Sequence, residues 1–243
     1  EPEQRNAAAA GLKAMIPIGR PFLDYVLSAL ADAGIRRACL VIGPEHEQVR
    51  RHYEAHPPRR ITVSFAIQER PLGTADAVVA AAACVGQEPF LVLNGDNFYP
   101  VEALRALRVL NEPALAAFGR EALLADGHIP AERIAHFAVV EADADGYLSR
   151  IIEKPDAGEL ARLPRDVRVS MNCWRLDARL VAACREVPPS PRGELELPLA
   201  VARAVAQGVR VRVVPVDAPV LDLSSRADIA AVAARLAGRE ANP

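Results

Sequence analysis

Short apolar segments alternate with amphipathic segments along most of the chain, and the most regular apolar segment is residues 90–93. These four consecutive apolar residues predict a strand buried on both faces, as in a parallel sheet. Similar patterns predict further strands at residues 38–42, 61–67, 114–118, 134–140, 147–152, 167–176 and 209–216. Helices are predicted at residues 21–33, 44–55, 75–85, 101–110, 178–186, 195–207 and 225–237.

Turn and cap residues mark the ends of several of these elements. Pro21 suits the first turn of the first helix, and Gly34 is suited to close it. Thr74 is a suitable N-cap for the helix at residues 75–85. Residues 143–146, Asp-Ala-Asp-Gly, are typical of a hairpin turn between two strands.

The order of the elements predicts an α/β fold. Strand and helix alternate with short links in the first half, which is typical of a doubly wound, mostly parallel sheet. The hairpin in the second half adds antiparallel strands, so we expect a three-layer, Rossmann-like mixed sheet. No repeat or long polar linker appears, and residues 1–243 are expected to form one domain. Residues 119–133 are a polar insertion, expected to be a surface excursion rather than a cover over a substrate.

Composition excludes some partners. A net charge of −2 gives no attraction for nucleic acid or an anionic membrane. No apolar run approaches the roughly 20 residues that a membrane span needs. The widely spaced cysteines are expected to be reduced core thiols, which indicates a cytoplasmic protein; they are Cys39, Cys84, Cys173 and Cys184. The oligomeric state stays open, and a homo-oligomer is compatible with the sequence.

Polar residues at the ends of the predicted strands are candidates for chemistry. Asp96 follows the central strand, where ligands usually bind in open α/β sheets. A carboxylate is a good ligand for Mg²⁺, and Gly95 lets the backbone approach a ligand closely. Asp222 has apolar neighbours, and a carboxylate is costly to bury unless it is paired or bound to a cation.

Two such acids at one place would repel each other unless a divalent cation lay between them. Lys13 and Lys154 would add positive charge suited to phosphate groups. The pattern therefore points to phosphoryl or nucleotidyl transfer with Mg²⁺. Each signal also has a structural interpretation: residues 94–97 as a plain turn, Gln68 as a surface residue, and Glu153 with Lys154 as an exposed strand end.

Five motifs in order resemble the sugar-phosphate nucleotidyltransferases, also called NDP-sugar pyrophosphorylases. They are Lys-Ala-Met-Ile-Pro-Ile-Gly-Arg-Pro at residues 13–21, Gln68 with Pro-Leu-Gly-Thr-Ala-Asp-Ala-Val at 71–78, Leu-Asn-Gly-Asp at 93–96, Glu-Lys-Pro at 153–155, and the late Asp222. The resemblance spans nearly all 243 residues. It implies a fold like that of nucleotide-diphospho-sugar and GT-A-type transferases, and the joining of a nucleoside triphosphate to a sugar 1-phosphate with release of pyrophosphate.

The resemblance also implies roles for individual residues. Asp96 and Asp222 would bind Mg²⁺, Lys13 the nucleotide phosphates, and Lys154 the region near the sugar phosphate; these four are the predicted catalytic residues. The predicted substrate-binding residues are Gln68, Gly73, Thr74, Gly95, Glu153, Asn172 and Glu194. Of these, Gln68 and Gly73 would read the nucleobase, and Glu153 the sugar hydroxyls. The amide of Gln68 can pair with a pyrimidine, which slightly favours UTP or dTTP, but residues 72–77, Leu-Gly-Thr-Ala-Asp-Ala, would also fit purine-using relatives, so the base stays open.

The chain departs from the family at its start. The family opens with a buried strand and a glycine-rich loop, and neither is visible before Lys13. We therefore expect these 243 residues to be part of a longer protein; if they are complete, catalysis and stability should be weak. Two other functions stay open. One is a non-catalytic relative that binds sugar nucleotides. The other is a GT-A-type glycosyltransferase, although Asn97-Phe98 stands where an Asp-x-Asp pair would be expected.

Overall fold

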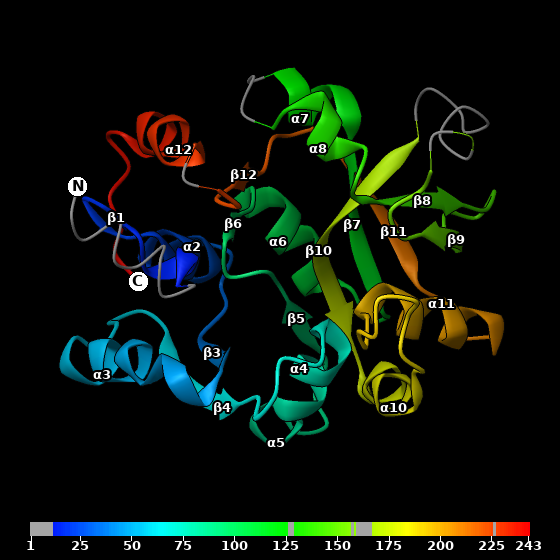
Figure 1. Cartoon of the computed structure of the whole chain (residues 1–243), viewed down its shortest axis with the longest axis horizontal. Coiled ribbons are helices and arrows are strands. Elements are labelled where there is room, and N and C mark those ends of the chain that lie inside the picture. Colours follow the sequence, from blue (N-terminus) through cyan, green and yellow to red (C-terminus); the bar gives the residue numbers. More distant parts are fainter. Residues whose placement is uncertain (1–11, 126–128, 157, 159–166, 226) are drawn as a thin grey trace.

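The computed structural model describes residues 12–125, 129–156, 158, 167–225 and 227–243. Its largest sheet has the strand order β11-β7-β10-β8-β9, and β5 pairs with β10 as well (Figure 1). These strands are β5 (Phe90–Val92), β7 (Ala114–Gly119), β8 (Ala138–Ala142), β9 (Leu148–Ile152), β10 (Arg168–Leu176) and β11 (Arg212–Val216). The predicted α/β class with a mixed sheet is confirmed.

Strand β10 determines the mixed character of the sheet. It pairs antiparallel with β5, β7 and β8, so these three strands share one direction. Strand β11 is parallel to β7. The predicted hairpin is confirmed: β8 and β9 pair antiparallel, and the Asp143 N–H donates to the Tyr147 carbonyl at 2.7 Å.

Among the described residues, three smaller strand pairs accompany the sheet. Strands β3 (Arg37–Ile42) and β4 (Thr62–Ile67) form a parallel pair. Two short pairs escaped sequence prediction because each strand has only two residues: β1 (Pro17–Ile18) with β2 (Arg20–Pro21), and β6 (Asn97–Phe98) with β12 (Leu221–Asp222). The second short pair is important because it contains Asp222.

Helices cover both faces of the sheet. The α-helices are α2 (Phe22–Asp32), α3 (Glu47–Ala55), α4 (Thr74–Ala80), α5 (Ala82–Val85), α6 (Val101–Val109), α7 (Arg120–Ala125), α8 (Ala131–Ile134), α10 (Ala178–Glu186), α11 (Leu197–Ala206) and α12 (Asp228–Leu236). Two 3₁₀ turns are η1 (Lys13–Met15) and η2 (Pro44–His46). Alternation along β7 shows the three layers: Phe118 packs into the cluster that includes α2 and α6, whereas Leu115 packs into the cluster that includes α4, α10 and α11.

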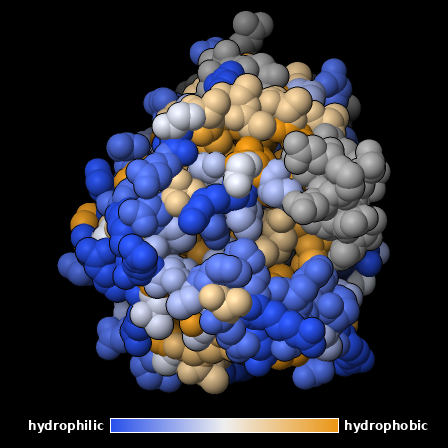
Figure 2. All heavy atoms as spheres, turned by 90° about the vertical axis from the view of Figure 1, so that its left-hand side faces the viewer, coloured by the Kyte–Doolittle hydropathy of each residue, from blue (hydrophilic) through white to orange (hydrophobic). Residues whose placement is uncertain are grey.

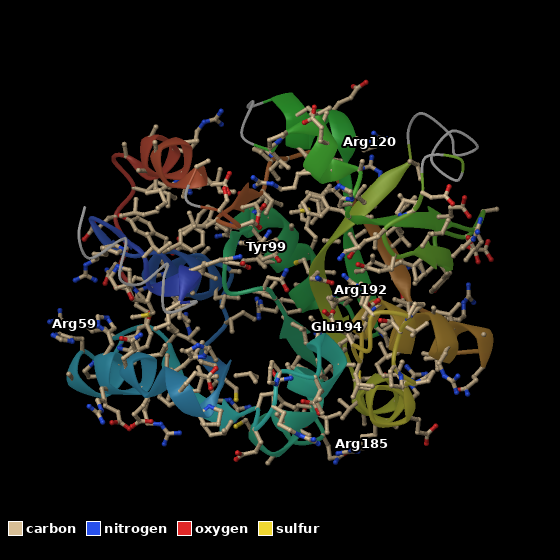
Figure 3. All side chains as sticks on the ribbon, viewed as in Figure 1. Arg59, Tyr99, Arg120, Arg185, Arg192 and Glu194 are labelled. Atoms are coloured by element: carbon tan, nitrogen blue, oxygen red, sulfur yellow. The ribbon has the colours of Figure 1, made fainter. Side chains whose placement is uncertain are left out.

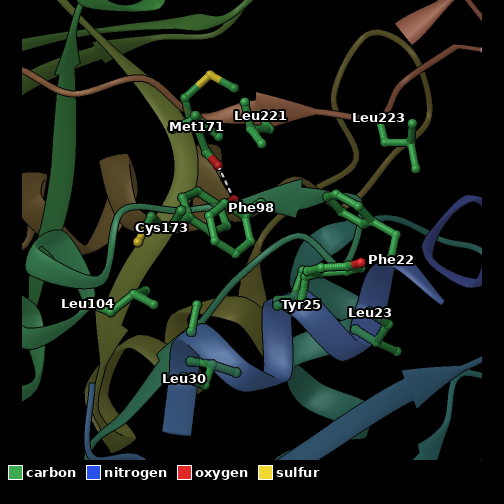
Figure 4. Close-up of a cluster of buried hydrophobic side chains, with 14 of the residues drawn as sticks. Phe22, Leu23, Tyr25, Leu30, Phe98, Leu104, Met171, Cys173, Leu221 and Leu223 are labelled. Atoms are coloured by element: carbon green, nitrogen blue, oxygen red, sulfur yellow. Dashed lines mark hydrogen bonds between the residues drawn. The ribbon is translucent and has the colours of Figure 1, made fainter. Parts of the chain in front are cut away.

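The first of these clusters is the larger core. Figure 4 shows side chains from α2, including Phe22 and Tyr25, facing Phe98 and the β10 residues Met171 and Cys173. Phe22 and Cys173 are fully buried. This core therefore packs α2 against the region where β6 meets β10, which positions the residues between these elements.

Four sequence predictions need correction. Residues 90–93 are half-buried, because β5 pairs with β10 whereas the β3–β4 pair forms a separate sheet among the described residues. The helix at 75–85 is interrupted at Ala81. The strand predicted from residue 134 begins at Ala138, because Ile134 ends α8. The insertion is no surface excursion, since the side chains of Leu123 and Ile129 are buried in the core.

Within the described ranges, no helix is both long and apolar enough to cross a bilayer. Figure 2 shows the face on the side of α3 and α12, where hydrophilic residues cover most of the lower half and hydrophobic ones are visible mainly toward the top and centre.

Candidate functional site

Asp96 and Asp222 come together although they are far apart in the sequence. Strand β12 pairs with β6 so that Asp222 stands opposite Asn97, the residue after Asp96. The backbone N–H of Leu223 donates to the carbonyl of Asp96 at 2.9 Å. The short β6–β12 pair therefore brings the two predicted metal ligands to one place.

The electrostatic environment of Asp96 contains both signs of charge. Burial raises the pKa of Asp96, and the negative charge of Asp222 raises it further. Lys13 lowers that pKa and lies with its Nζ 4.0 Å from Oδ2 of Asp96, but the net shift is upward. Lys13 lies beside Asp96 and Arg133 beside Asp222, and a cation between the two carboxylates would further relieve their repulsion.

Asp222 is deeply buried and hydrogen-bonded. Its side chain is only 3% exposed, and it accepts hydrogen bonds from Ser224 Oγ at 2.6 Å and from Arg133 Nη1 at 3.0 Å. Each carboxylate oxygen has a second lone pair, so these bonds still allow a metal ion to be coordinated. Arg133 was not among the sequence candidates.

The donor set fits Mg²⁺. Mg²⁺ in enzymes usually binds one or two carboxylates and completes its six ligands with water and substrate phosphates. Asp96 and Asp222 supply two such carboxylates. In the part of the chain that the structure describes, no group of three or more His, Cys, Asp or Glu side chains suits a metal ion, so an all-protein cage is not formed there.

Tyr99 links the turn that contains Asp96 to strand β10. Its hydroxyl accepts a hydrogen bond from the Asn94 N–H at 3.3 Å and donates to the Met171 carbonyl at 2.5 Å. Gly95, in the same turn, lies beside η1: a Cβ there would be 3.8 Å from that of Ala14. The turn is thus held between η1 and β10.

Asn172 has a strained backbone at a bulge in β10. Its φ is 55°, in the left-handed region that asparagine tolerates better than most residues. The register against β7 shifts between Ser170 and Trp174, and Trp174 Nε1 donates to Asn172 Oδ1 at 3.2 Å. Bulges often redirect side chains near functional sites. The bulge is compatible with the predicted substrate-binding role of Asn172, which stays a prediction.

Gln68, Gly73 and Thr74 form a second group after strand β4. Gln68 Nε2 donates to the Gly73 carbonyl at 3.0 Å and to Asp76 Oδ2 at 2.8 Å, so Gln68 is not a freely moving surface residue. Thr74 does not cap its own helix, because Gly73 occupies that N-cap. Its Oγ1 instead accepts the N–H of Leu197 at 2.9 Å, at the start of α11.

Glu153 and Lys154 lie at the rim of a cavity of about 310 Å³ that is also lined by Arg192 and Glu196. Burial raises the pKa of Glu153 to about 7, and the charge of Glu196 contributes to the rise. Lys154 is exposed and has a φ of 47°. These residues could hold a polar, phosphate-bearing molecule.

Glu194 and Glu196 both pair with Arg192. Figure 3 shows Arg192 and Glu194 near the middle of the view, and Arg192 Nη2 lies 3.5 Å from Glu194 Oε2. Glu194 is exposed, whereas Glu196 is buried and accepts hydrogen bonds from Ser190 and Arg192. Among the described residues, no hydrogen bond or ion pair joins Glu153 or Lys154 to Asp96.

Sequence reasoning missed Arg133, Arg192, Glu196, Asp76 and Tyr99. Glu196 stands two residues from Glu194 in an Arg-Gly-Glu-Leu-Glu segment, and a buried acid beside a cavity could have been suspected from that repetition. Arg133 gave no signal, because its partners lie far along the chain.

The comparisons with known proteins agree on one family. A family model described as nucleotidyl transferase matches residues 9–218. The bifunctional protein GlmU of Methanococcus maripaludis strain C7 is 28% identical over 197 residues, covering 81% of this chain and 42% of that protein. Glucose-1-phosphate thymidylyltransferase of Streptomyces antibioticus is 28% identical over 218 residues, covering 86% of this chain and 56% of that protein. The chain thus spans about half the length of these relatives.

A crystal structure of UDP-glucose pyrophosphorylase in complex with UDP-glucose has a similar fold. Its TM-score is 0.75 at 16% sequence identity, and the match covers 94% of this chain and 91% of that one. At that identity the likeness concerns the fold alone, and it confirms the expected nucleotide-diphospho-sugar transferase architecture.

Proposed function

The chain belongs to the nucleotidyl transferase family, and from this premise we propose that it joins a nucleoside triphosphate to a sugar 1-phosphate, releasing pyrophosphate. One observation carries the proposal: Asp96 and Asp222 meet through the β6–β12 pair, with Lys13 4.0 Å from Asp96. Two carboxylates and an amine at one place suit a triphosphate bound with Mg²⁺.

In this mechanism the sugar phosphate oxygen attacks the α-phosphorus in line, and pyrophosphate leaves from the opposite side. Asp96 and Asp222 would hold Mg²⁺, which would supply positive charge to the triphosphate oxygens. Lys13 receives a phosphate oxygen, and Gly95 lets the nucleotide approach the backbone. No covalent intermediate is needed, because positioning and charge neutralisation lower the barrier.

The sugar 1-phosphate binds in the cavity beside Glu153. Lys154 and Arg192 provide the positive charge for its phosphate, and Glu153 accepts or donates hydrogen bonds with its hydroxyls. Glu194 pairs with Arg192 at this cavity, and Asn172, on β10, is proposed to contact the sugar. The cavity thus contains both cationic groups for a phosphate and a carboxyl group for sugar hydroxyls.

The nucleobase is read by Gln68, Gly73 and Thr74, and UTP or dTTP is favoured. Both hydrogen bonds from Gln68 Nε2 go to protein acceptors, so its Oε1 is the side-chain atom proposed to accept a hydrogen bond from the base. The N3–H of uracil or thymine can donate to that oxygen, as can N–H groups of the other bases, so the triphosphate screen decides the base. The thiols of all four cysteines are free, but only Cys173 and Cys184 are buried, and the expectation of a core thiol is wrong for Cys84, which is exposed. We propose the reducing cytoplasm as the location.

A pyrophosphate-release screen tests the proposal. Five nucleoside triphosphates are combined with a panel of sugar 1-phosphates and Mg²⁺, and one pair is expected to release pyrophosphate. Calorimetric binding of a triphosphate without release would instead indicate a non-catalytic relative. Transfer of sugar from an NDP-sugar to an acceptor would indicate a glycosyltransferase.

Asp96→Asn should then abolish most turnover in the active pair. Loss of one preorganised charge-stabilising group costs about 10²–10³ in kcat. Circular dichroism should report an intact fold, and Asp145→Asn, at an exposed acid in the β8–β9 hairpin, should keep full activity. Near-unchanged turnover by Asp96→Asn with Mg²⁺ would contradict the assignment.

A further inference from the structure

Arg133 joins two buried carboxylates from different elements. Its Nη1 donates to Asp222 Oδ2 at 3.0 Å and to Asp228 Oδ2 at 3.0 Å, and its Nη2 donates to Asp228 Oδ1 at 3.0 Å. The side chains of Asp222 and Asp228 are 3% and 6% exposed, and that of Arg133 is 24% exposed. The guanidinium thus connects α8 to β12 and to the first residue of α12.

Asp228 anchors this arrangement. It accepts hydrogen bonds from the Ser225 N–H at 2.7 Å and from Ser225 Oγ at 2.9 Å, in addition to the fork from Arg133. Burial alone would raise the pKa of Asp228, but the hydrogen bonds from Arg133 and Ser225 outweigh it and lower the pKa. A planar guanidinium whose two Nη atoms both bind one carboxylate has little freedom to rotate.

The fixed guanidinium in turn restrains Asp222. Arg133 reaches Oδ2 and Ser224 reaches Oδ1, so the carboxylate is held at both oxygens. Strand β12 places Asp222 opposite Asn97, and the N–H of Leu223 donates to the carbonyl of Asp96 at 2.9 Å, so the β6–β12 pair holds Asp222 and Asp96 close together. Arg133 therefore acts on the two-aspartate site through Asp222.

We propose that Arg133 is a positioning residue that orients Asp222 for a divalent cation shared with Asp96. This inference rests on the proposed function only in taking Asp222 as a cation ligand. The proposal also assigns a role to the insertion at residues 119–133, because Arg133 is its last residue. The opposite hypothesis, in which Arg133 competes with the metal for Asp222, predicts tighter metal binding when the arginine is removed.

Binding of Mn²⁺, measured by water proton relaxation on the full chain, separates these hypotheses. Arg133→Met is expected to weaken Mn²⁺ binding about 10–100-fold, the usual cost of losing a group that orients a metal ligand. Arg133→Lys should also weaken it, since an amine cannot hold both carboxylates in one plane. Asp228→Asn, which loosens the anchor and leaves Arg133 in place, should weaken it to a smaller degree.

Arg168→Met is the matched control. Arg168 is 27% exposed and forms a two-nitrogen pair with Asp217, which is not one of the candidate metal ligands. This variant should bind Mn²⁺ like the unchanged chain. Adding Mn²⁺ should raise the melting temperature of Arg168→Met as much as that of the unchanged chain, and that of Arg133→Met by less. If Arg133 had only a structural role, Arg133→Met would melt at a lower temperature with and without Mn²⁺, and the rise on adding Mn²⁺ would be unchanged.

Equal or tighter Mn²⁺ binding by both Arg133 variants would overturn the inference while leaving the two-aspartate site standing. If Arg133→Met fails to fold, Arg133→Lys and Asp228→Asn carry the test. Absence of Mn²⁺ binding by the unchanged chain would overturn this inference and the proposed cation site together.

Discussion

The carboxyl group of Glu153 is expected to make stability depend on pH. Its pKa is raised from 4.5 to about 7, first by burial and then by Glu196, while Arg192 opposes the rise. The folded state therefore favours the neutral acid. Its contribution to stability is complete below the unfolded pKa of 4.5 and is lost as the pH rises through about 7.

Glu153→Gln stays neutral at every pH and should remove this loss. Relative to the unchanged chain, the variant should gain free energy of unfolding at about pH 8 compared with about pH 5. Urea denaturation at both pH values measures the difference. Glu88→Gln, at an exposed glutamate, should show no such gain. If the free energies of unfolding of Glu153→Gln and the unchanged chain differed equally at both pH values, the Glu153 carboxyl would have the same pKa in the folded and unfolded states.

A single functional residue can be predicted from the sequence when its immediate neighbours in the chain mark it. Asp96 was predictable because it ends an apolar segment, and Asp222 because it has apolar neighbours on both sides. Arg133 and Glu196 were not, because the first is defined by acids on β12 and α12 and the second by an arginine in a proline-rich loop. Long-range pairing leaves no pattern in a single sequence.

Among the elements, α4 and α11 are joined through Gly73. Its φ is 128° and its ψ 179°, a combination essentially restricted to glycine. A Cβ there would lie 2.5 Å from the carbonyl oxygen of Leu195. The Leu195 N–H donates to the Leu72 carbonyl at 2.7 Å, so this contact is fixed from both sides.

Gly73→Ala should therefore lower the free energy of unfolding by about 1–3 kcal/mol, through backbone strain and collision with Leu195. Chemical denaturation measures the loss. Gly86→Ala is the control: its φ is 66°, but a Cβ there meets nothing within 4 Å, so only backbone strain remains. An equal loss in both variants would mean that α11 moves away from Gly73 at no cost.

The predicted elements were mostly present, and the errors have local causes. Helix α10 has the predicted bounds, since Asp177 caps it through the N–H groups of Arg179 and Leu180. The 75–85 helix was expected to be continuous, but α4 and α5 meet at Ala81. Strands β6 and β12 have two residues each, too few for any periodicity to appear.

Across the whole molecule, the strands differ in how many strands they pair with and in how deeply they are buried. Strand β7 pairs with both β10 and β11, and its residues from Ala114 to Phe118 are fully buried. Within the described residues, β3 pairs with β4 alone, and most residues of both strands are half-buried or exposed. Local opening requires less free energy where fewer apolar contacts are broken.

Amide hydrogen exchange should show this difference. Backbone amides of β3 and β4 are expected to exchange faster than those of β7 and β10, which mass spectrometry of peptides from one sample can compare directly. Exchange in β3 and β4 as slow as in β7 would contradict the expectation that the parallel pair opens independently of the main sheet.

The class of fold was predictable because it depends on the order of strands and helices, which the hydrophobic pattern records. Apart from the β8–β9 hairpin, the neighbours of the strands were not predictable. Strand β10 lies between β7 and β8 and also pairs with β5, and nothing in its own sequence specifies those three partners.

The hydroxyl of Tyr99 has a consequence for how the specificity of such a protein can change. Asn94 and Met171 share that one group, the first in the turn of Asp96 and the second beside Asn172. A mutation that moved the β10 backbone near Asn172, a proposed sugar contact, would also shift the turn that positions Asp96, a proposed metal ligand. New sugars are therefore more readily accommodated by exchanging side chains around the cavity than by remodelling the strand, and divergence should concentrate in those side chains while Tyr99 is retained.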